Sequence, residues 1–244
     1  MVLDFDGTLA PIVADRDAAS LAPATRAALR LVAKCYPVAI LSGRSAADVR
    51  ARLDGALVTW VVGNHGAGWP RSGRSYRSLV GSWRKTLKRR MGAVKEVEIE
   101  DKGNSLALHF RGARRPGQAA STIARAIAGL PGASVIPGKR VVNLVPAAAG
   151  DKGTALGRMA EAAGAARVLF VGDDITDESA FRATLPVPLV TVRVGHWART
   201  AARYHVSRRA DVDLLLRDLA RLRKPAKRAP RRGAEGQAGR TRGD

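Results

Sequence analysis

The run from Val2 to Leu9 constrains the fold more than any other stretch of the sequence. In it two carboxylates, Asp4 and Asp6, alternate with apolar residues, and Gly7 follows them. Strict alternation predicts a buried strand, and glycine permits the sharp turn that would end it. Because side chains two apart on a strand share a face, we expect Asp4 and Asp6 to point the same way. Two carboxylates held side by side require a positive charge or a shared proton, and a divalent cation with oxygen ligands is the simplest solution.

Size and cysteine content limit the class of protein. A chain of 244 residues with 46% hydrophobic content can bury one large core or two smaller ones. No apolar run approaches the roughly 18 residues of a membrane span, and the N-terminus lacks the basic and apolar regions of a secretion signal. The single cysteine, Cys35, fits a reducing compartment because it has no internal disulfide partner. We therefore expect a cytoplasmic, globular monomer.

Apolar strands alternate with amphipathic helices in two separate parts of the chain, residues 1–70 and 146–222. After the first run, the predicted strands are 38–41, 57–62, 167–171, 187–194 and 204–206, and the predicted helices include 25–34, 45–53, 154–163 and 211–222. This alternation predicts an α/β fold, a Rossmann-like parallel sheet with helices on its faces. Only Met1 to Leu3 precede Asp4, so we expect the first strand to be short.

Residues 71–145 follow a different pattern. A basic helix is predicted over 78–92, and alternating strands over 94–100 and 105–111 are joined by hairpin residues. A helix over 118–128 and strands near 134–136 and 141–145 complete the segment. These elements predict a compact α+β domain inserted between the two halves of the α/β core. Residues 223–244 are basic and carry almost nothing large to bury, so we predict a disordered tail.

Further polar clusters follow predicted strands or open predicted helices. They are Ser42-Gly43-Arg44, Lys152-Gly153, and Gly172-Asp173-Asp174 with Asp177. In open α/β sheets ligands bind at the carboxyl ends of the strands, so we expect these clusters to meet Asp4 and Asp6 in one crevice. Each cluster has an ordinary alternative, because the first is also a strand-to-helix turn and the acids of the last can cap a helix. The ordered set is more specific than any member of it.

The set suits phosphoryl transfer to a carboxylate. Asp4 would attack phosphorus to form an aspartyl phosphate. Asp6 would protonate the leaving oxygen and then take a proton from the water that hydrolyses the intermediate. Repulsion between phosphate and carboxylate amounts to about 4 kcal/mol per pair of unit charges at about 4 Å, so the site needs cations.

Magnesium and a lysine can supply that positive charge. We expect Mg²⁺ on the carboxylates of Asp4 and Asp173 and the main-chain carbonyl of Asp6, with waters completing the octahedron. The main-chain N–H groups that open the helix after Gly43 can hold phosphoryl oxygens. The predicted metal-site residues are Asp4, Asp6, Asp173, Asp174 and Asp177, and the predicted phosphate-binding residues are Ser42, Gly43, Arg44 and Lys152.

From Val2 to about Leu222 the chain resembles a known family. The four clusters above resemble the four motifs of haloacid dehalogenase (HAD) superfamily phosphatases. Gly63-Asn64-His65-Gly66, and Glu100-Asp101-Lys102 followed by Leu106 to Arg111, are similar to the trehalose-6-phosphate phosphatase family within it. The resemblance implies a Mg²⁺-dependent hydrolase, a mobile cap over a Rossmann-like core, and a substrate of two linked glucoses carrying one phosphate.

The resemblance also implies residues that grip the sugar. Family members use a glutamate and a lysine that match Glu100 and Lys102, and we place His65 in the same substrate set. A second glutamate is expected in a pattern like Gly-Lys-x-Val-x-Glu, where this chain has Asn143. An amide still bonds hydroxyl groups but loses charge-assisted bonds, so another sugar phosphate remains an alternative substrate. Glu100 and Lys102 could also simply flank a hairpin.

The net charge of the chain suggests a different function, nucleic-acid binding. Its 42 Lys and Arg against 21 Asp and Glu give a formal net charge of +21, which is typical of nucleic-acid-binding proteins. Residues 71–115 hold a large share of the excess. Such a patch would bind phosphates non-specifically, but it could equally steer an anionic substrate, and a high arginine content can reflect genome base composition. Because no nucleic-acid-binding motif accompanies it, we expect no specific nucleic-acid partner.

Overall fold

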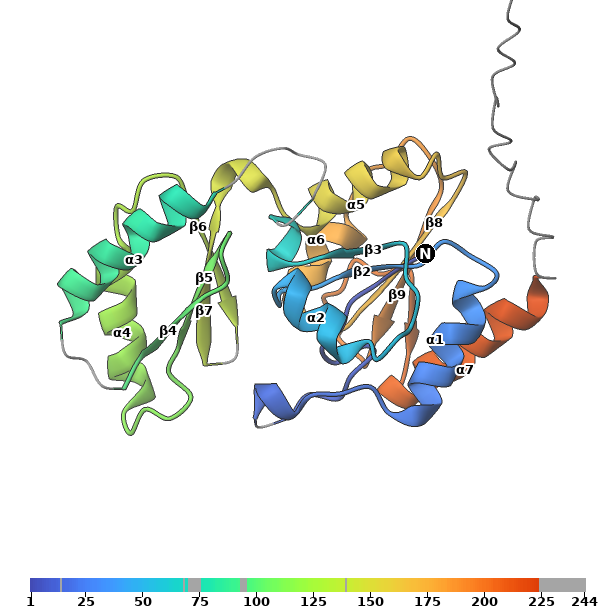
Figure 1. Cartoon of the computed structure of the whole chain (residues 1–244), viewed down its shortest axis with the longest axis horizontal. Helices are drawn as coiled ribbons and strands as arrows, with labels where there is room; N and C mark the ends of the chain where they lie inside the picture. Colours follow the sequence, from blue (N-terminus) through green and yellow to red (C-terminus); the bar gives the residue numbers. More distant parts are fainter. Residues whose placement is uncertain (14, 68, 70–75, 93–95, 139, 224–244) are drawn as a thin grey trace, which may run out of the picture.

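The structure, a computed structural model, describes residues 1–13, 15–67, 69, 76–92, 96–138 and 140–223. Within this part of the chain there are two separate β-sheets, each covered by helices (Figure 1). No helix in these residues is long and apolar enough to cross a membrane. The predicted tail lies almost entirely outside the described residues.

The larger sheet has six parallel strands in the order β10-β9-β8-β1-β2-β3. They are β1 (Val2–Leu3), β2 (Ala39–Leu41), β3 (Trp60–Val62), β8 (Val168–Gly172), β9 (Leu189–Val194) and β10 (Tyr204–Val206). The chain builds outward from β1 in one direction through β2 and β3, and in the other through β8 to β10. The point between β1 and β8 is therefore a topological switch point, where α/β sheets form a ligand crevice.

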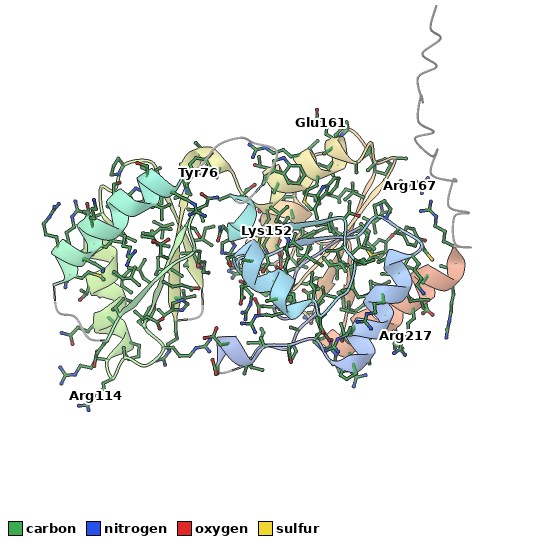
Figure 2. The ribbon with its side chains drawn as sticks, viewed as in Figure 1. Tyr76, Arg114, Lys152, Glu161, Arg167 and Arg217 are labelled. Atoms are coloured by element: carbon green, nitrogen blue, oxygen red, sulfur yellow. The ribbon has the colours of Figure 1, made fainter. Side chains whose placement is uncertain are left out.

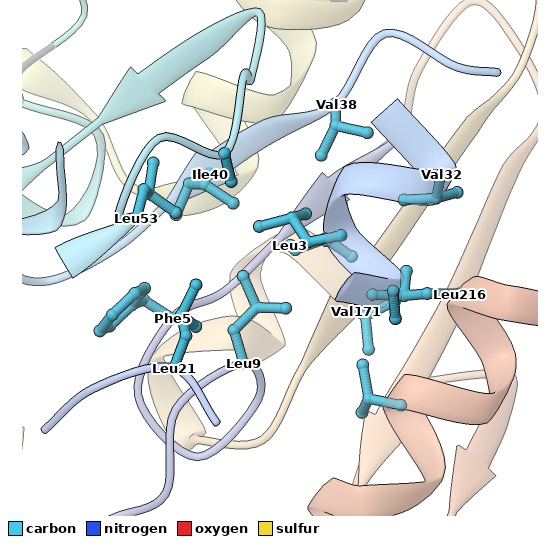
Figure 3. Close-up of a cluster of buried hydrophobic side chains, with 14 of the residues drawn as sticks. Leu3, Phe5, Leu9, Leu21, Val32, Val38, Ile40, Leu53, Val171 and Leu216 are labelled. Atoms are coloured by element: carbon cyan, nitrogen blue, oxygen red, sulfur yellow. The ribbon is translucent and has the colours of Figure 1, made fainter. Parts of the chain in front are cut away.

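Helices cover both faces of this sheet, which confirms the predicted α/β fold (Figure 1). They are α1 (Pro23–Ala33), α2 (Ala46–Arg52), α5 (Lys152–Ala162), α6 (Glu178–Phe181) and α7 (Arg209–Leu222). On one face, Val32 of α1 and Leu216 of α7 bury against Leu3 (Figure 3). On the other face, Phe181 of α6 packs edge-on against Phe170 of β8 at 5.5 Å between ring centroids. Successive side chains along each strand point to opposite faces of the sheet, and both faces are buried.

Residues 76–146 form a second unit with its own core, which we call the cap. Its four strands pair antiparallel in the order β4-β5-β7-β6. The elements are α3 (Arg77–Met91), β4 (Glu98–Asp101), β5 (Leu106–His109), α4 (Pro116–Ile127), β6 (Ala133–Gly138) and β7 (Val141–Pro146). Trp83 and Ile123 from the two helices bury against Leu108 and Leu144, so both helices lie on one face of the sheet. The other face of the sheet is directed toward the parallel-sheet unit (Figure 1).

Most predicted elements are present with ends shifted by a few residues. Of the strand predicted over 57–62, only the last three residues form a strand, β3. Of the strand predicted over 94–100, only the last three residues belong to a strand, β4, which continues to Asp101. Residues 94 and 95 of that prediction lie outside the described part. Strand ends are set by tertiary pairing, which residue patterns report poorly.

The first strand ends earlier than its alternation predicts. β1 contains only Val2 and Leu3, although it pairs with both β2 and β8. Asp4 adds one ladder bond, from its N–H to Val171 O at 2.9 Å, and the chain then turns. Gly7 makes this turn possible because its φ of +82° lies in the left-handed region. Asp4 and Asp6 thus lie beyond the strand, where the rule that alternate side chains share a face no longer applies.

Candidate active site

Three carboxylates meet at the carboxyl ends of β1 and β8. Asp4 follows β1, and Asp173 and Asp177 follow β8. One carboxylate oxygen from each lies within 4.8 Å of the others. Asp4 is 4% exposed and Asp177 is fully buried. The convergence of Asp4 with the acids after β8 therefore arises because two neighbouring parallel strands end together at the switch point.

Lys152 is the first residue of α5 (Figure 2). It supplies positive charge to this group of acids. Its Nζ donates to Asp4 Oδ1 at 2.7 Å and to Asp177 Oδ1 at 2.6 Å. Burial alone would lower the pKa of Lys152, but the charges of Asp177 and Asp4 outweigh it and raise that pKa. The lysine is therefore charged at neutral pH, and it balances one of three carboxylates.

Asp173 has no ion-pair partner among the described residues. Thr8 Oγ1 donates to its Oδ1 at 3.2 Å. Burial, and then the charge of Asp177, raises the pKa of Asp173 to about 7. Burial also raises the pKa of Asp4 well above its usual value, despite Lys152. The ionised form of this pair is therefore unfavourable without more positive charge, and a divalent cation with oxygen ligands would supply it.

The other two acids after β8 have structural tasks. Asp177 accepts from Lys152 through Oδ1, and its Oδ2 accepts from the N–H groups of Asp173 and Asp174 at 2.9 Å each. Asp174 accepts from the N–H of Ile175 at 2.7 Å and lies outside the group of three acids. The helix-capping alternative therefore applies to Asp174. Asp177 lies close enough to Asp4 and Asp173 to share a metal with them, but both of its oxygens already accept hydrogen bonds. We therefore place the proposed metal on Asp4 and Asp173 and leave Asp174 out of the site.

Asp6 has a different partner from the one expected. Its carboxylate accepts from Arg44 Nε at 2.6 Å and from Nη2 at 2.8 Å, a bidentate pair. Arg44 also binds Asp48 through Nη1 at 2.8 Å, one turn along α2. The expectation that Asp4 and Asp6 share a face around one cation is thus wrong for the Asp6 side chain, because the strand ends before it. An arginine, not a metal, balances the charge of Asp6.

Ser42, Gly43 and Arg44 form the connection from β2 to α2. Ser42 is 1% exposed, and its Oγ accepts from the N–H of Arg44 at 3.1 Å. The next residue, Ser45, caps α2 by accepting from the N–H of Asp48 at 3.1 Å. The predicted strand-to-helix turn is therefore present, and Ser45 caps the helix that follows it. The Arg44 and Asp48 N–H groups are already bonded, so in this structure they are not open to a phosphate.

A strained loop after β3 joins the cap to this site. Asn64 and His65 both have φ of +55°, which is costly for residues other than glycine. Asn64 Nδ2 donates to Lys102 O at 3.3 Å, and its Oδ1 accepts from Ser105 Oγ at 3.0 Å. Lys102 Nζ in turn donates to Gly43 O at 3.1 Å. The β4–β5 hairpin of the cap is therefore bonded directly to the β2–α2 connection.

His65 lies under this contact. Its side chain is buried, and its Nδ1 has no hydrogen-bond partner in the described part of the chain. Burial, and then the charges of Lys152 and Lys102, lowers the pKa of His65 well below its usual range. The ring is therefore neutral at pH 7. A buried neutral imidazole with an unsatisfied nitrogen suits hydrogen bonding to a polar ligand.

A cavity of about 430 Å³ lies between the cap sheet and the α/β unit. From the α/β side it is lined by Asp6, Asp17, Gly43, Arg44, Ser45, Asp48, His65, Asp173, Asp174 and Thr176, among others. From the cap side it is lined by Glu100, Lys102, His109, Arg111, Pro137, Gly138, Val141 and Asn143. Within it, His109 Nε2 lies 2.8 Å from Glu100 Oε2, and Lys102 Nζ lies 3.8 Å from the same oxygen. The cavity thus joins polar and charged side chains of the cap with Asp6 and Asp173 of the α/β unit.

Comparison with known proteins identifies the family. The family model described as trehalose-phosphatase matches residues 2–210. The chain belongs to the trehalose-phosphatase family. The trehalose-phosphate phosphatase of Mycolicibacterium paratuberculosis is 38% identical over 212 residues, which cover 79% of this chain and 54% of that protein. The chain spans about half the length of the curated relatives it matches.

Solved structures agree with a trehalose-phosphatase fold. The C-terminal domain of the trehalose-6-phosphate phosphatase of C. albicans has a TM-score of 0.70 at 22% identity, covering 90% of each chain. A phosphatase of the HAD superfamily from Bacteroides thetaiotaomicron has a TM-score of 0.60 at 15% identity, covering 89% of this chain and 93% of that one. The predicted HAD-type fold with an inserted cap is therefore confirmed.

Three residues of this candidate site did not emerge from the sequence as site residues. Thr8 belongs to the first motif and holds Asp173, so its motif position was a usable signal. His109 lies in the segment from Leu106 to Arg111, which carries the family resemblance but suggested no role for this residue. Asp48 follows Arg44 by four residues, the spacing of an ion pair on a helix.

Replacing Gly7 by alanine is expected to disrupt the group of three acids. A Cβ at position 7 would overlap the carboxylate of Asp173, and φ of +82° is unfavourable for alanine. We expect the variant to lose Mg²⁺ affinity and at least about 100-fold in activity, because a misplacement of about 1 Å costs that much. Isothermal titration with Mg²⁺ and steady-state phosphate release would measure both.

Gly164→Ala is the matched control. Gly164 has φ of +54°, and nothing lies within 4 Å of a Cβ built there. It therefore carries the backbone penalty without the overlap. If Gly164→Ala reduced Mg²⁺ affinity as much as Gly7→Ala does, the effect would be general destabilisation and not displacement of Asp173.

Magnesium affinity is expected to fall in acid. Because the pKa of Asp173 is raised to about 7, the metal-free carboxyl holds a proton below that pH. Mg²⁺ must displace this proton, so the apparent affinity should drop up to about tenfold per pH unit below pH 7 and level off above it. Titration calorimetry in buffers of different ionisation enthalpy would show the proton released.

The same raised pKa makes stability depend on pH. Between the unfolded value of about 4 and the folded value of about 7, the folded state keeps a proton on Asp173 that the unfolded chain has lost. Stability without Mg²⁺ should therefore fall as the pH rises through this window, and Mg²⁺ should offset the fall. An affinity for Mg²⁺ that is equal on both sides of pH 7 would contradict this assignment.

Proposed function

We propose that this chain hydrolyses trehalose 6-phosphate to trehalose and phosphate, the final chemical step in making trehalose. The observation that carries the proposal is the position of Asp4, a buried carboxylate bonded to Lys152. It has an oxygen within 4.8 Å of one on Asp173, which lines the same cavity as Glu100, Lys102 and Asn143 of the cap. Membership of the trehalose-phosphatase family supports the same reaction. The single cysteine, which is buried, supports action in the cytoplasm.

Magnesium is the cofactor that the acid group fits. Asp4 and Asp173, with the main-chain carbonyl of Asp6, would hold Mg²⁺, which on binding neutralises charge on the phosphoryl oxygens. Hard oxygen donors and unbalanced negative charge are the features that support this metal. Lys152 has three N–H donors, and its bonds to Asp4 and Asp177 leave one for a phosphoryl oxygen.

The reaction proceeds in two displacements at phosphorus. In the first, a carboxylate oxygen of Asp4 forms a bond to phosphorus while the bond from phosphorus to the sugar oxygen breaks. Asp6 gives its proton to that leaving oxygen, so trehalose departs as a neutral alcohol. In the second, Asp6 takes a proton from water as the water oxygen attacks phosphorus. The bond from Asp4 to phosphorus then breaks, which restores the carboxylate and releases phosphate.

Arg44 must change partner for Asp6 to act as an acid. In this structure the guanidinium holds both oxygens of Asp6. We propose that the phosphoryl group of the substrate competes for Arg44, since arginine binds phosphate bidentately as well as carboxylate. Substrate binding would thereby free Asp6 in front of the leaving oxygen. Asp48, which also binds Arg44, would keep the guanidinium in place during the exchange.

Sugar specificity is proposed to lie in the cap. Glu100, Lys102 and Asn143 offer acceptors and donors that suit sugar hydroxyl groups. His109 touches Glu100 and orients its carboxylate. Asn143 replaces a charged family residue with an amide, and this difference favours a second candidate function, hydrolysis of another sugar phosphate by the same chemistry.

A panel of phosphorylated sugars tests the proposal. With Mg²⁺ present, phosphate release should be fastest from trehalose 6-phosphate and much slower from glucose 6-phosphate, which lacks the second ring that the cavity can hold. A higher kcat/KM for a monosaccharide phosphate would show that this sugar is the substrate and that the proposed chemistry still applies. Absence of release from every sugar phosphate would contradict the proposed function.

Asn143→Glu is expected to improve the enzyme on trehalose 6-phosphate. A carboxylate there would make a charge-assisted hydrogen bond to a hydroxyl, worth about 1.5 kcal/mol more than the amide bond, so kcat/KM should rise about tenfold. Glucose 6-phosphate turnover should change little if the contact is to the second ring. Equal changes in kcat/KM for both substrates would show that residue 143 does not contact the second sugar ring.

A further inference from the structure

The outer surface of helix α3 is strongly and uniformly basic. The helix contains Arg77, Arg84, Lys85, Lys88, Arg89 and Arg90, and it contains no acidic residue. All six side chains are exposed. Arg84 pairs with Asp101 at 3.3 Å, and Arg90 donates to main-chain carbonyls of Ala126 and Ala128. Lys85, Lys88 and Arg89 have no acidic partner among the described residues, so their charge is available to a ligand.

This basic surface lies on the far side of the cap from the catalytic cavity. The cap strands alternate, so Leu108 and Leu144 point to the helices while Glu100 and Asn143 point to the cavity. The helix α3 packs on the first set, with Trp83 fully buried. In Figure 1 the sheet accordingly separates α3 from the α/β unit. The row of charges therefore does not line the substrate path, and its presence is not explained by contact with the sugar phosphate.

Several of the basic residues lie along one side of the α3 helix. Arg77, Arg84 and Lys88 are separated by seven and four residues, which places them on one stripe of the helix, with Lys85 and Arg89 beside it. At 1.5 Å per residue the stripe extends about 16 Å. The neighbouring helix α4 also has no acidic residue. Near the far end of the cap, Arg114 is exposed as well (Figure 2).

We propose that this face of α3 binds the phosphate backbone of a nucleic-acid duplex without sequence preference. A duplex carries one negative charge per roughly 1.7 Å of its axis, a rigid linear array that several cations along one straight helix can contact at once. Charge complementarity supplies the binding energy through release of counterions. The contact would tether the phosphatase through its cap helices and leave the catalytic cavity open to substrate.

Two other polyanions fit this surface less well. Insertion into an anionic membrane requires exposed apolar side chains beside the cations, and the large apolar residues of α3 are buried or half-buried. Single-stranded nucleic acid is held by bases stacking on exposed aromatic rings, whereas Trp83, the aromatic residue within α3, is 0% exposed. The surface offers charge alone, which is what backbone binding to a duplex uses.

The test compares two triple variants of the full chain with equal loss of charge. K85Q/K88Q/R89Q removes the unpaired charges of α3. R50Q/R167Q/R199Q removes three exposed charges of the α/β unit that have no acidic partner in the described residues. Fluorescence anisotropy with a labelled DNA duplex over a series of NaCl concentrations gives the affinity and its salt slope. Steady-state phosphate release serves as the folding check, and we expect both variants to keep the activity of the unmodified chain.

We expect the α3 variant to reduce the magnitude of the log–log salt slope by about 3, roughly one for each cation that no longer meets a phosphate, and the control variant to leave it unchanged. An equal effect of both variants would show that net charge alone drives binding and would overturn the proposal. So would an unchanged affinity of the α3 variant, the result expected if the basic tail were the binding site. Tighter binding to single-stranded DNA or to anionic phospholipid vesicles than to the duplex would overturn it as well.

Discussion

Replacing Asp4 by asparagine is expected to reduce phosphate release from trehalose 6-phosphate by about 10⁴-fold or more. An amide oxygen is a poor nucleophile toward phosphorus, and removing a nucleophile typically abolishes nearly all of the catalysed rate. The variant also loses one of the two carboxylates proposed to hold Mg²⁺. Steady-state kinetics at saturating Mg²⁺, with the amount of enzyme raised to detect residual turnover, would measure the loss.

Stability separates this effect from misfolding. Because burial raises the pKa of Asp4, its negative charge is unfavourable in the metal-free fold, and asparagine can still accept the hydrogen bond from Lys152. We therefore expect Asp4→Asn to unfold at a temperature at least as high as the unmodified chain. Glu161→Gln, the same chemical change at an exposed position, should alter neither property. Undiminished turnover by Asp4→Asn would remove the nucleophile assignment.

Replacing Lys152 by methionine is expected to produce the largest loss of stability. The lysine is 2% exposed and bonds two carboxylates, of which Asp4 is 4% exposed and Asp177 is fully buried. Removing the cation leaves both acids buried without their counter-charge, and breaking such a pair typically costs about 3–5 kcal/mol. Urea unfolding at neutral pH without Mg²⁺ would measure the free energy of unfolding.

A second substitution tests the cause of that loss. Asp177→Asn combined with Lys152→Met removes one of the unbalanced charges, so the double variant should be more stable than the sum of the two single effects indicates. Lys34→Met, at an exposed lysine, should change stability by less than about 0.5 kcal/mol. If Lys152→Met were as mild as Lys34→Met, the three charges would not form the tightly bonded group described above.

Most of the architecture could be predicted from the sequence because the residue periodicities of strands and of helices indicate it. Alternating strands and helices on either side of a differently patterned insert predicted the parallel sheet and the separate antiparallel sheet, and both are present. The convergence of Asp4 with Asp173 also followed, because residues after neighbouring parallel strands must meet at one edge. The lengths of the strands could not be predicted in this way. The alternation from Val2 to Leu9 continues past Leu3, where the backbone has already left the sheet.

Side-chain pairing was the part that residue patterns could not supply. The bidentate contact between Arg44 and Asp6 joins two loops that are 38 residues apart, and either partner alone is also a plausible ligand for phosphate or metal. The same holds for Asp174, whose residue type fits a metal site as well as a helix cap. The bonds from Asn64 to the cap hairpin depend on how the two units pack, and no local pattern encodes that.

The most direct measurement of the central claim is a crystal structure of the chain with Mg²⁺ and beryllium trifluoride, a mimic of a phosphoryl group on a carboxylate. The account predicts beryllium bonded to a carboxylate oxygen of Asp4, the ion shared by Asp4 and Asp173, and a fluorine within hydrogen-bond reach of Lys152. Beryllium on another side chain, or magnesium bound away from these two acids, would contradict it.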